Sequence, residues 1–461
     1  MHREAIFKNS MFTGKPIIAG LFSEAIMKQQ HSARIALKAM FTTLQYLAKQ
    51  GISIRGHDHG SGNYMELLAV RSHDIPELKD FLLRSKPMTG WMIQNEMLQM
   101  MGKALLHSVL KGVREDKEFS IIVDETTDCS TKEQVSITVR SVGKQFDVKE
   151  QFLGLYETTS TTSETLTDII KDPLVRCSLS LDHLRGQCYD GASNMKGVHS
   201  GVQARIYAIQ PLAVYIHCCN HSLNLALQDT ARAVPQLRDA LQWVHDAAKI
   251  LNTSKGRNDF LEIVNDLEDI PMMTLKTLCP TRWTVRHAAI NSVLATYPAV
   301  TKMMEHLSTT GTDSLSVAAG LFTQFKKCEV YLFLLIAKDV FGPTEKLSLV
   351  LEGQTQTVSG ACKAAELTLK HLREIRNDEH FSILWKEMSA AQDKYNLNVP
   401  KVPRLKKVPR RLEHKLNPAD PVAYETPHDL FRKVFYEVLD VVIGEVERRF
   451  KQPDTEALKA L

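Results

Sequence analysis

The sequence predicts a mixed α/β domain joined to a large all-helical region. Two patterns lead to this prediction: β-forming and helical segments alternate between residues 116 and 233, and helical apolar spacing dominates the chain on both sides. The composition agrees, because 461 residues with 44% hydrophobic and 24% charged side chains are typical of a globular chain. The predicted fold class is therefore α/β plus all-α.

Residues 1–115 are predicted to form a helical N-terminal region. Apolar residues recur there at helical spacing, from Ala33 to Leu44 and again from Met97 to Leu106. Between these helices lies IRGHDHGSGN at residues 54–63, which we interpret as a turn in preference to a metal or phosphate site. The methionines of residues 92–101 are interpreted as core packing.

Residues 116–233 are predicted to form a mixed sheet with helices on its faces. Strands are expected at residues 119–124, 134–142, 148–157, 184–189 and 213–218, and helices at 163–176 (capped by Ser163), 194–209 and 221–232. Short polar turns separate the first three strands, which should pair as hairpins. The resulting order, βββαβαβα, is that of an RNase H-like domain, in which the first and fourth strands lie side by side.

Residues 234–425 are predicted to be a helical domain, and residues 426–461 to contain a last helix. Periodic apolar segments are found at 237–251, 259–267, 283–294, 342–352, 358–376 and 427–450. A basic tract at about residues 399–416 contains VPKVPRLKKVPRRLEHK, whose prolines exclude a regular helix. We expect this tract to be an exposed loop.

Several protein classes are excluded or left without support. The net charge of +4, from 57 basic and 53 acidic residues, is too small to predict polyanion binding by itself. The longest apolar run, Val330 to Ala337, is shorter than the roughly 20 residues of a bilayer helix, and residues 1–22 do not resemble a signal peptide. We expect an intracellular protein without membrane partners, whose eight cysteines remain reduced.

Two carboxylates are the first candidates for chemistry. Asp124 ends the first predicted strand and Asp190 follows the fourth, so their side chains should converge at one edge of the sheet. Two such carboxylates can hold hard divalent ions such as Mg²⁺, and paired ions cleave phosphodiesters. The alternative is that DETTD and DGASN are ordinary capping and turn sequences.

Four strings resemble a known family. IIVDETTDCSTKEQVSI, RGQCYDGASNMKGVHSGVQARI, YIHCCNHSLNLAL and LCPTRWTVR occur in the order found in the hAT transposase superfamily. Within it, the chain is most similar to the group of zinc finger MYM-type protein 1, which includes relatives described as TTF-type zinc-finger proteins. The resemblance covers about residues 22–450. It implies an RNase H-like core interrupted by a large helical insertion.

The resemblance implies an incomplete catalytic set. Asp124 and Asp190 match the first two catalytic acids of the family. The third is a glutamate in a C-terminal Ser-Glu-Arg block, also used for dimerisation, and no such block precedes Leu461. Glu445 and Glu447 are formal candidates, but we expect them among solvent-facing charges and not in this role. The N-terminal zinc finger of such proteins is also unmatched, because the first hundred residues contain no cysteine.

Two further motifs follow from the resemblance. Cys218 and His221 match the family's CxxH motif, and Arg282 with Trp283 match its RW motif, whose tryptophan is associated with stacking on an extruded base. Such stacking is worth roughly 1–3 kcal/mol. Packing and capping are the alternative for the RW pair. We predict a structural role for Cys218 and His221 and no zinc, because no second ligand pair accompanies them.

The basic tract offers a nucleic-acid contact. Lys406, Lys407, Arg410 and Arg411 lie within it, and such a cluster neutralises phosphates or serves as a nuclear import signal. A solvated loop is the alternative.

The sequence as a whole predicts a nuclear, hAT transposase-derived protein, either domesticated or truncated, that binds DNA or protein partners without transposing. The rival predictions are a Mg²⁺-dependent nuclease that uses Asp124, Asp190 and an acid supplied by missing sequence or another chain, and a protein-interaction remnant. No small-molecule substrate is expected.

Overall fold

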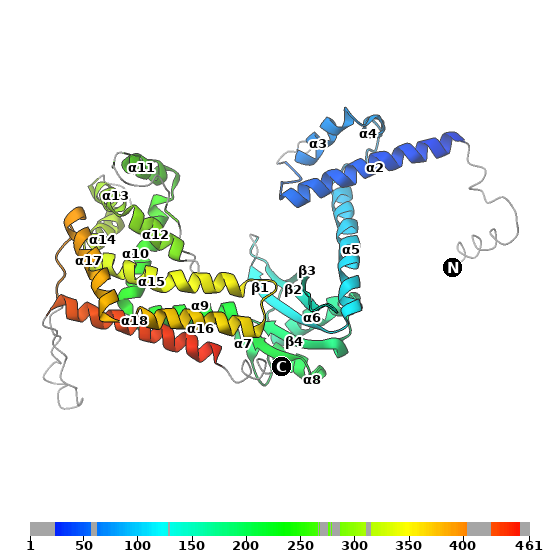
Figure 1. The fold of residues 1–461 in the computed structure, drawn as a ribbon. Coiled ribbons are helices and arrows are strands. Elements are labelled where there is room, and N and C mark those ends of the chain that lie inside the picture. The colour runs from blue at the N-terminus through cyan, green and yellow to red at the C-terminus, as the bar shows by residue number, and fades with distance from the viewer. Residues whose placement is uncertain are drawn as a thin grey trace. The chain divides into compact units, whose positions relative to one another are not determined.

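The computed structural model describes residues 24–56, 62–127, 130–265, 267, 275–276, 278, 286–309, 315–402 and 426–451 (Figure 1). The chain divides into two compact units, Met1–Glu115 and Asp116–Leu461. In the described ranges, no helix combines the length and apolar character needed to span a membrane.

The first unit is helical. It contains α2 (Glu24–Gln50), α3 (Asn63–Ser72), α4 (Pro76–Leu82) and α5 (Trp91–Asp116). Ala36, Met40 and Leu44 recur every four residues along α2 and are fully buried, together with Leu68 of α3 and Leu78 of α4. The helices of this unit are therefore held by one small apolar core of their own.

The methionines of α5 are not all core residues. Met97 is 4% exposed, but Met92 and Met100 are 66% and 53% exposed. The packing interpretation therefore holds for one face of the helix, and the other methionines face solvent. Of the Gly- and His-rich turn, residues 57–61 lie outside the described residues.

The second unit begins with a five-stranded mixed sheet. Its strands are β1 (Phe119–Thr127), β2 (Glu133–Val142), β3 (Val148–Thr158), β4 (Leu184–Tyr189) and β5 (Val214–His217), in the order β3-β2-β1-β4-β5. β1, β2 and β3 pair antiparallel, whereas β4 pairs parallel with both β1 and β5. The predicted hairpins and the predicted neighbourhood of the first and fourth strands are confirmed.

Helices follow the strands from β3 onwards. They are α6 (Ser163–Arg176), α7 (Ser193–Lys196), α8 (Val202–Ile209) and α9 (Cys219–Ala233), with a short 3-10 turn at Leu181–His183. Two predictions are wrong here. Thr162, and not Ser163, caps α6, because its hydroxyl accepts from the Thr165 N–H at 3.4 Å. The single helix expected over residues 194–209 is two helices, because the chain folds back between them and brings Gly197 against Gly201.

The rest of the second unit is helical. Its helices are α10 (Pro235–Leu251), α11 (Ser254–Asn265), α12 (His287–Ala295), α13 (Tyr297–Thr309), α14 (Leu315–Phe325), α15 (Cys328–Leu351), α16 (Val358–Glu374), α17 (Asp378–Tyr395) and α18 (Pro427–Phe450). The last helix has the predicted bounds. Sequence periodicity missed α13, α14 and α17. It also placed the start of α15 at residue 342, because the first half of α15 is buried on all sides and shows no polar face.

One apolar core joins these helices to α9. It contains Leu227 of α9, Phe341 of α15 and Leu439 of α18. α9 and α18 pack against each other although they are far apart in sequence, and Arg449 of α18 donates to Asp229 of α9 at 2.6 Å (Figure 1). The helical part is thereby tied to the helix that follows the last strand of the sheet.

Candidate functional site at the carboxyl ends of β1 and β4

Asp124 and Asp190 lie at the same edge of the sheet. The parallel register pairs Ile122 of β1 with Cys188 of β4, and each aspartate comes two residues after its member of this pair. Side chains two residues apart on a strand share a face. The geometry therefore brings the two candidate acids to neighbouring strand ends, as the sequence predicts, and Asp124 is exposed there.

Asp190 also has the ordinary role of a turn residue. One of its carboxylate oxygens accepts from the Ala192 N–H at 3.1 Å, and its carbonyl oxygen accepts from the Tyr215 hydroxyl at 3.3 Å. These bonds hold the chain where β4 passes into the loop before α7. The DGASN segment therefore forms a turn in the structure. The second carboxylate oxygen of Asp190 takes no part in this turn and can make other contacts.

A third acid, Glu125, lies beside the pair. Its carboxylate accepts from the Asn194 side-chain amide at 3.1 Å. Burial raises the pKa of Glu125, and the negative charges of Asp190, Glu133 and Asp124 raise it further, against the hydrogen bond from Asn194. Sequence analysis overlooked this residue because strand alternation turns it away from Asp124. The only signal was the adjacency of the two acids in the DETTD string.

These residues do not fit a two-metal centre. Among the described residues, no three side chains of the His, Cys, Asp and Glu types are arranged to hold one ion. Two-metal cleavage needs several carboxylate oxygens converging on both ions. Glu125 does not supply them, since its carboxylate is bonded to Asn194.

A cysteine pair lies next to the acids. Cys188 is on β4, and Cys218 is the N-cap residue of α9. The hydrogen bond with the Cys188 thiol, helped by the backbone N–H groups of His221 and Asn220, lowers the pKa of Cys218 to about 7, although burial and the charge of Asp124 oppose this. The neighbouring thiol of Cys219 has its pKa raised to about 12 by burial. The six described cysteines form no disulfide: Cys177, Cys188, Cys218, Cys219, Cys328 and Cys362.

His217 and His221 complete this edge. Their ring centroids are 5.5 Å apart, and a side chain at Gly191 would meet His217 Nε2 at 2.8 Å. Burial, together with the electrostatic effect of His221 and Lys196, lowers the pKa of His217 to about 4. His217 Nε2 is buried without a hydrogen-bond partner. His221 is half-buried in the first turn of α9, and the structural role predicted for it and Cys218 stays a prediction.

The two formal candidates for a third acid are occupied elsewhere. Glu445 pairs with Arg448 and Arg449, and these hydrogen bonds lower the pKa of Glu445 in spite of its burial. Glu447 pairs with Arg373 of α16 and with Lys451. Their side chains are 25% and 29% exposed, and their partners Arg448, Arg373 and Lys451 are 61%, 51% and 59% exposed. The two acids are therefore half-buried and lie among solvent-facing charges, as expected.

The helical part contacts the same edge through Asn220. This residue, at the start of α9, donates to Glu352 at 2.8 Å and accepts from the Ser348 hydroxyl at 2.7 Å. Both partners belong to the C-terminal end of α15. The first turn of α9, which carries Cys218 and His221, is therefore bonded to one segment that is distant in sequence, the C-terminal end of α15.

The predicted nucleic-acid-binding residues lie outside the described residues. These are Arg282, Trp283, Lys406, Lys407, Arg410 and Arg411. The described N-terminal flank of the basic tract is anchored to α15 and the residues before it: Asn398 donates to the Lys326 carbonyl at 2.7 Å, and the Lys401 N–H donates to Glu329 at 3.3 Å.

Residues 1–201 match the family model described as DUF4371: ZMYM1/FAM200, RNase-like domain. The matched range includes the N-terminal helices, β1 to β4, and both Asp124 and Asp190. The predicted resemblance to the zinc finger MYM-type protein 1 group is confirmed, as are the α/β sheet and the helical class of the remainder.

Two curated relatives match most of the chain. The "52 kDa repressor of the inhibitor of the protein kinase" of Homo sapiens is 24% identical over 382 residues, which is 76% of this chain and 49% of that protein. The protein of the same name from Mus musculus is 23% identical over 381 residues, with the same coverage. The chain thus spans about half the length of the curated relatives it matches.

Proposed function

We propose that this chain, whose first 201 residues match the model of the ZMYM1/FAM200 RNase-like domain, is a transposase-derived protein that binds nucleic acid without cutting it. The observation that carries the proposal is the strand order β3-β2-β1-β4-β5, with Asp124 on β1 and Asp190 just after the neighbouring strand β4, at equal offsets from a paired residue. This arrangement keeps the scaffold of a nucleic-acid-processing domain.

The inference that the chain does not cut rests on the state of the acids. Asp190 has one carboxylate oxygen in its turn, Glu125 is bonded to Asn194, and Glu445 and Glu447, the formal candidates for a third acid, are paired with arginines. Loss of a ligand from a two-metal centre removes the placement of the attacking and leaving oxygens. A Mg²⁺-dependent nuclease would need an acid from another chain or from further sequence.

The inference that the chain binds nucleic acid rests on the basic tract. It holds seven basic residues against one acid, Glu413, between α17 and α18. Its described flank is fixed to the body of the helical part at Asn398 and Lys401. A cationic segment attached to a folded domain neutralises backbone phosphates and releases their counterions, so its affinity should fall steeply with salt.

Fluorescence polarisation with a labelled DNA duplex tests this proposal across a salt series. Replacing Arg410 and Arg411 by alanine should weaken binding at every DNA sequence and reduce the slope of log affinity against log salt by about 2, one unit for each lost phosphate contact. The matched control is Lys363→Ala with Lys386→Ala, two exposed cations on α16 and α17.

The same protein is then tested for cleavage. Supercoiled DNA incubated with Mg²⁺ or Mn²⁺ should stay intact with the wild-type chain, and Asp124→Ala should leave DNA affinity unchanged. Metal-dependent nicking that disappears in Asp124→Ala would establish the nuclease instead. An unchanged salt slope in the Arg410 and Arg411 variant would refute binding through the tract.

We infer a nuclear location from the same tract, because short basic clusters serve as import signals. A fluorescent fusion of the full chain should concentrate in nuclei, and replacing Lys406 and Lys407 should return it to the cytoplasm. Equal distribution of both fusions would contradict this inference.

A further inference from the structure

Helix α2 of the first unit carries a row of cations on one face. Residues 25–50 contain no aspartate or glutamate, and their basic side chains are Lys28, His31, Arg34, Lys38 and Lys49. The last four of these are exposed, and successive members are three, four and eleven residues apart. Such spacings place side chains on the same side of a helix. We call these four residues the α2 stripe.

The apolar face of α2 lies on the opposite side of the helix. Met40 comes two residues after Lys38, which separates the two side chains by about 200° around the helix axis. Ala36, Met40 and Leu44 are fully buried in the core of the first unit. The packing of this unit therefore keeps the α2 stripe towards solvent.

The α2 stripe is not neutralised within the first unit. Among the described residues of this unit, no carboxylate forms a salt bridge with any of its four cations. Arg71 of α3 is different, because its guanidinium donates to the Ala39 carbonyl and the Thr43 hydroxyl, each at 2.7 Å. Arg34 and Lys38 lie four residues apart, a spacing at which like charges repel and destabilise a helix. A bound anion would remove this repulsion.

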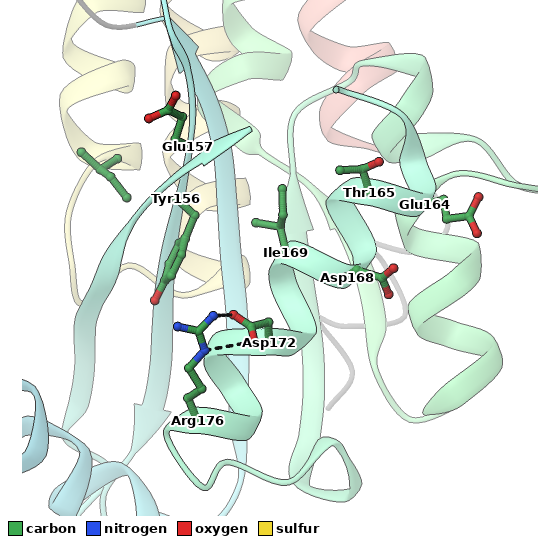
Figure 2. A pocket seen from close by; sticks show the side chains of 9 residues that line it. Tyr156, Glu157, Glu164, Thr165, Asp168, Ile169, Asp172 and Arg176 are labelled. Carbon is green, nitrogen blue, oxygen red and sulfur yellow. Dashed lines mark hydrogen bonds and ion pairs between the residues drawn. The ribbon is translucent and has the colours of Figure 1, made fainter. Parts of the chain in front are cut away.

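Other charged surfaces of the chain differ in this respect. A groove of about 730 Å³ between β3 and α6 is lined by four carboxylates (Figure 2). Three of them form ion pairs inside the chain: Glu157 with Lys132, Asp168 with Lys171, and Asp172 with Arg176. The acids of this groove are therefore largely neutralised by their own neighbours, whereas the cations of the α2 stripe are not.

We propose that the α2 stripe binds the phosphate backbone of a DNA duplex. This inference rests on the proposed function and adds a contact surface in the first unit, separate from the basic tract. The stripe extends about 27 Å at 1.5 Å per residue, which is close to the roughly 34 Å of one duplex turn. Its side chains donate to phosphate oxygens, so they add affinity without reading the base sequence.

An acidic protein and an anionic membrane fit this surface less well. The core of a protein interface is apolar and poor in charge. Between residues 31 and 49, all of which the structure describes, Tyr46 is the one exposed large hydrophobic side chain. A helix that lies in a membrane surface inserts its apolar face, and the core of the first unit occupies that face of α2. A linear polyanion needs neither apolar contact.

The experiment uses the full chain and fluorescence polarisation with a labelled duplex of about 20 base pairs, or two helical turns, over a salt series. Arg34→Gln with Lys38→Gln should reduce the slope of log affinity against log salt by about 2 and weaken binding about ten-fold at low salt, because two phosphate contacts are lost. Glutamine has nearly the helix propensity of arginine and lysine, so α2 should stay folded. Circular dichroism checks this.

Three controls separate the α2 stripe from the net charge of the chain and from an acidic protein partner. Lys103→Gln with Lys111→Gln removes the same charge from exposed positions of α5 and should leave the salt slope unchanged. The charge-conserving variant Arg34→Lys with Lys38→Arg should bind the duplex as the wild-type chain does. Labelled poly-glutamate is the probe for an acidic protein, and its binding should be weaker than that of the duplex.

Three outcomes would overturn the proposal. They are an unchanged salt slope in the glutamine variant of α2, an equal loss of slope in the α5 variant, and a loss of poly-glutamate binding without a loss of duplex binding. The last result would assign the α2 stripe to an acidic protein.

Failure of this inference is distinct from failure of the proposed function. If replacing Arg410 and Arg411 lowers the salt slope and the glutamine variant of α2 does not, only the α2 contact is refuted. If the wild-type chain binds no duplex, the proposed function fails together with this inference. A lowered slope in the α2 variant alone would support the α2 contact and refute binding through the tract.

Discussion

At the scale of single residues, Cys218 and Cys219 are adjacent thiols with opposite properties. The hydrogen bond with Cys188 and the N–H groups of α9 lower the pKa of Cys218 to about 7, whereas burial raises that of Cys219 to about 12. Alkylation by iodoacetamide, followed by mass spectrometry, should give a midpoint near pH 7 for Cys218 and leave Cys219 unmodified at pH 8.

The variant Cys188→Ala tests the cause of this difference. Removing the neighbouring thiol should move the alkylation midpoint of Cys218 upward, towards the value of an ordinary cysteine, and should not change Cys219. If the two cysteines titrate together in the wild-type chain, the contact between β4 and the start of α9 is not as described.

His217 should make stability depend on pH. Its pKa is lowered by burial to about 4 in the folded chain, against about 6.5 when unfolded, so the unfolded state binds the proton first as pH falls. The stabilisation is complete above pH 6.5 and is lost between pH 6.5 and 4. Because the ring is only half-buried and partly screened, we expect a loss of about 1 kcal/mol.

Urea unfolding at several pH values measures this effect. The wild-type free energy of unfolding should fall more steeply between pH 6.5 and 4.5 than that of His217→Asn, which cannot gain a proton. Parallel curves for the two proteins would contradict the assignment. His221→Asn is the control, because it removes the other histidine of the His217–His221 ring pair.

At the scale of elements, the pairing of α9 with α18 should govern the stability of the helical part. Leu439 of α18 is fully buried, so Leu439→Ala should destabilise this part by about 2–5 kcal/mol through lost contacts and a cavity. Hydrogen exchange should quicken in both α18 and α9. Leu367→Ala, at a 61% exposed position on α16, should change neither helix.

The helices and strands also show how much of the fold can be predicted from the sequence. Apolar runs and segments rich in β-forming residues located the five strands, and the strand order brought Asp124 and Asp190 to neighbouring strand ends. α15 was only half recognised, because a helix buried on all sides lacks the polar stripe that periodicity requires. The bond from Asn194 to Glu125 and the pairing of Glu445 with Arg449 depend on tertiary contacts, which no local pattern carries.

At the scale of the whole molecule, the two compact units should unfold separately. Leu68 is fully buried in the core of the first unit, which consists of residues from α2 to α5. Leu68→Ala should therefore quicken hydrogen exchange in α2 and α4 while protection in β1 and β4 is unchanged. Val70→Ala, at a 61% exposed position of the same helix, is the control. Loss of protection in the sheet would show that the units fold as one.

The pairing of α9 with α18 has a consequence for synthesis. Asp229 and Arg449 are separated by 220 residues, so α9 leaves the ribosome long before the helix that covers it. At a synthesis rate of about 5–20 residues per second, the apolar face of α9 stays uncovered for roughly 10–40 seconds before α18 is made. Leu223 and Leu227 are fully buried in the folded protein. During that interval they remain exposed on the nascent chain, where chaperones can bind them. Slowing translation over α10–α17 should lengthen this exposure and increase aggregation of newly made chains.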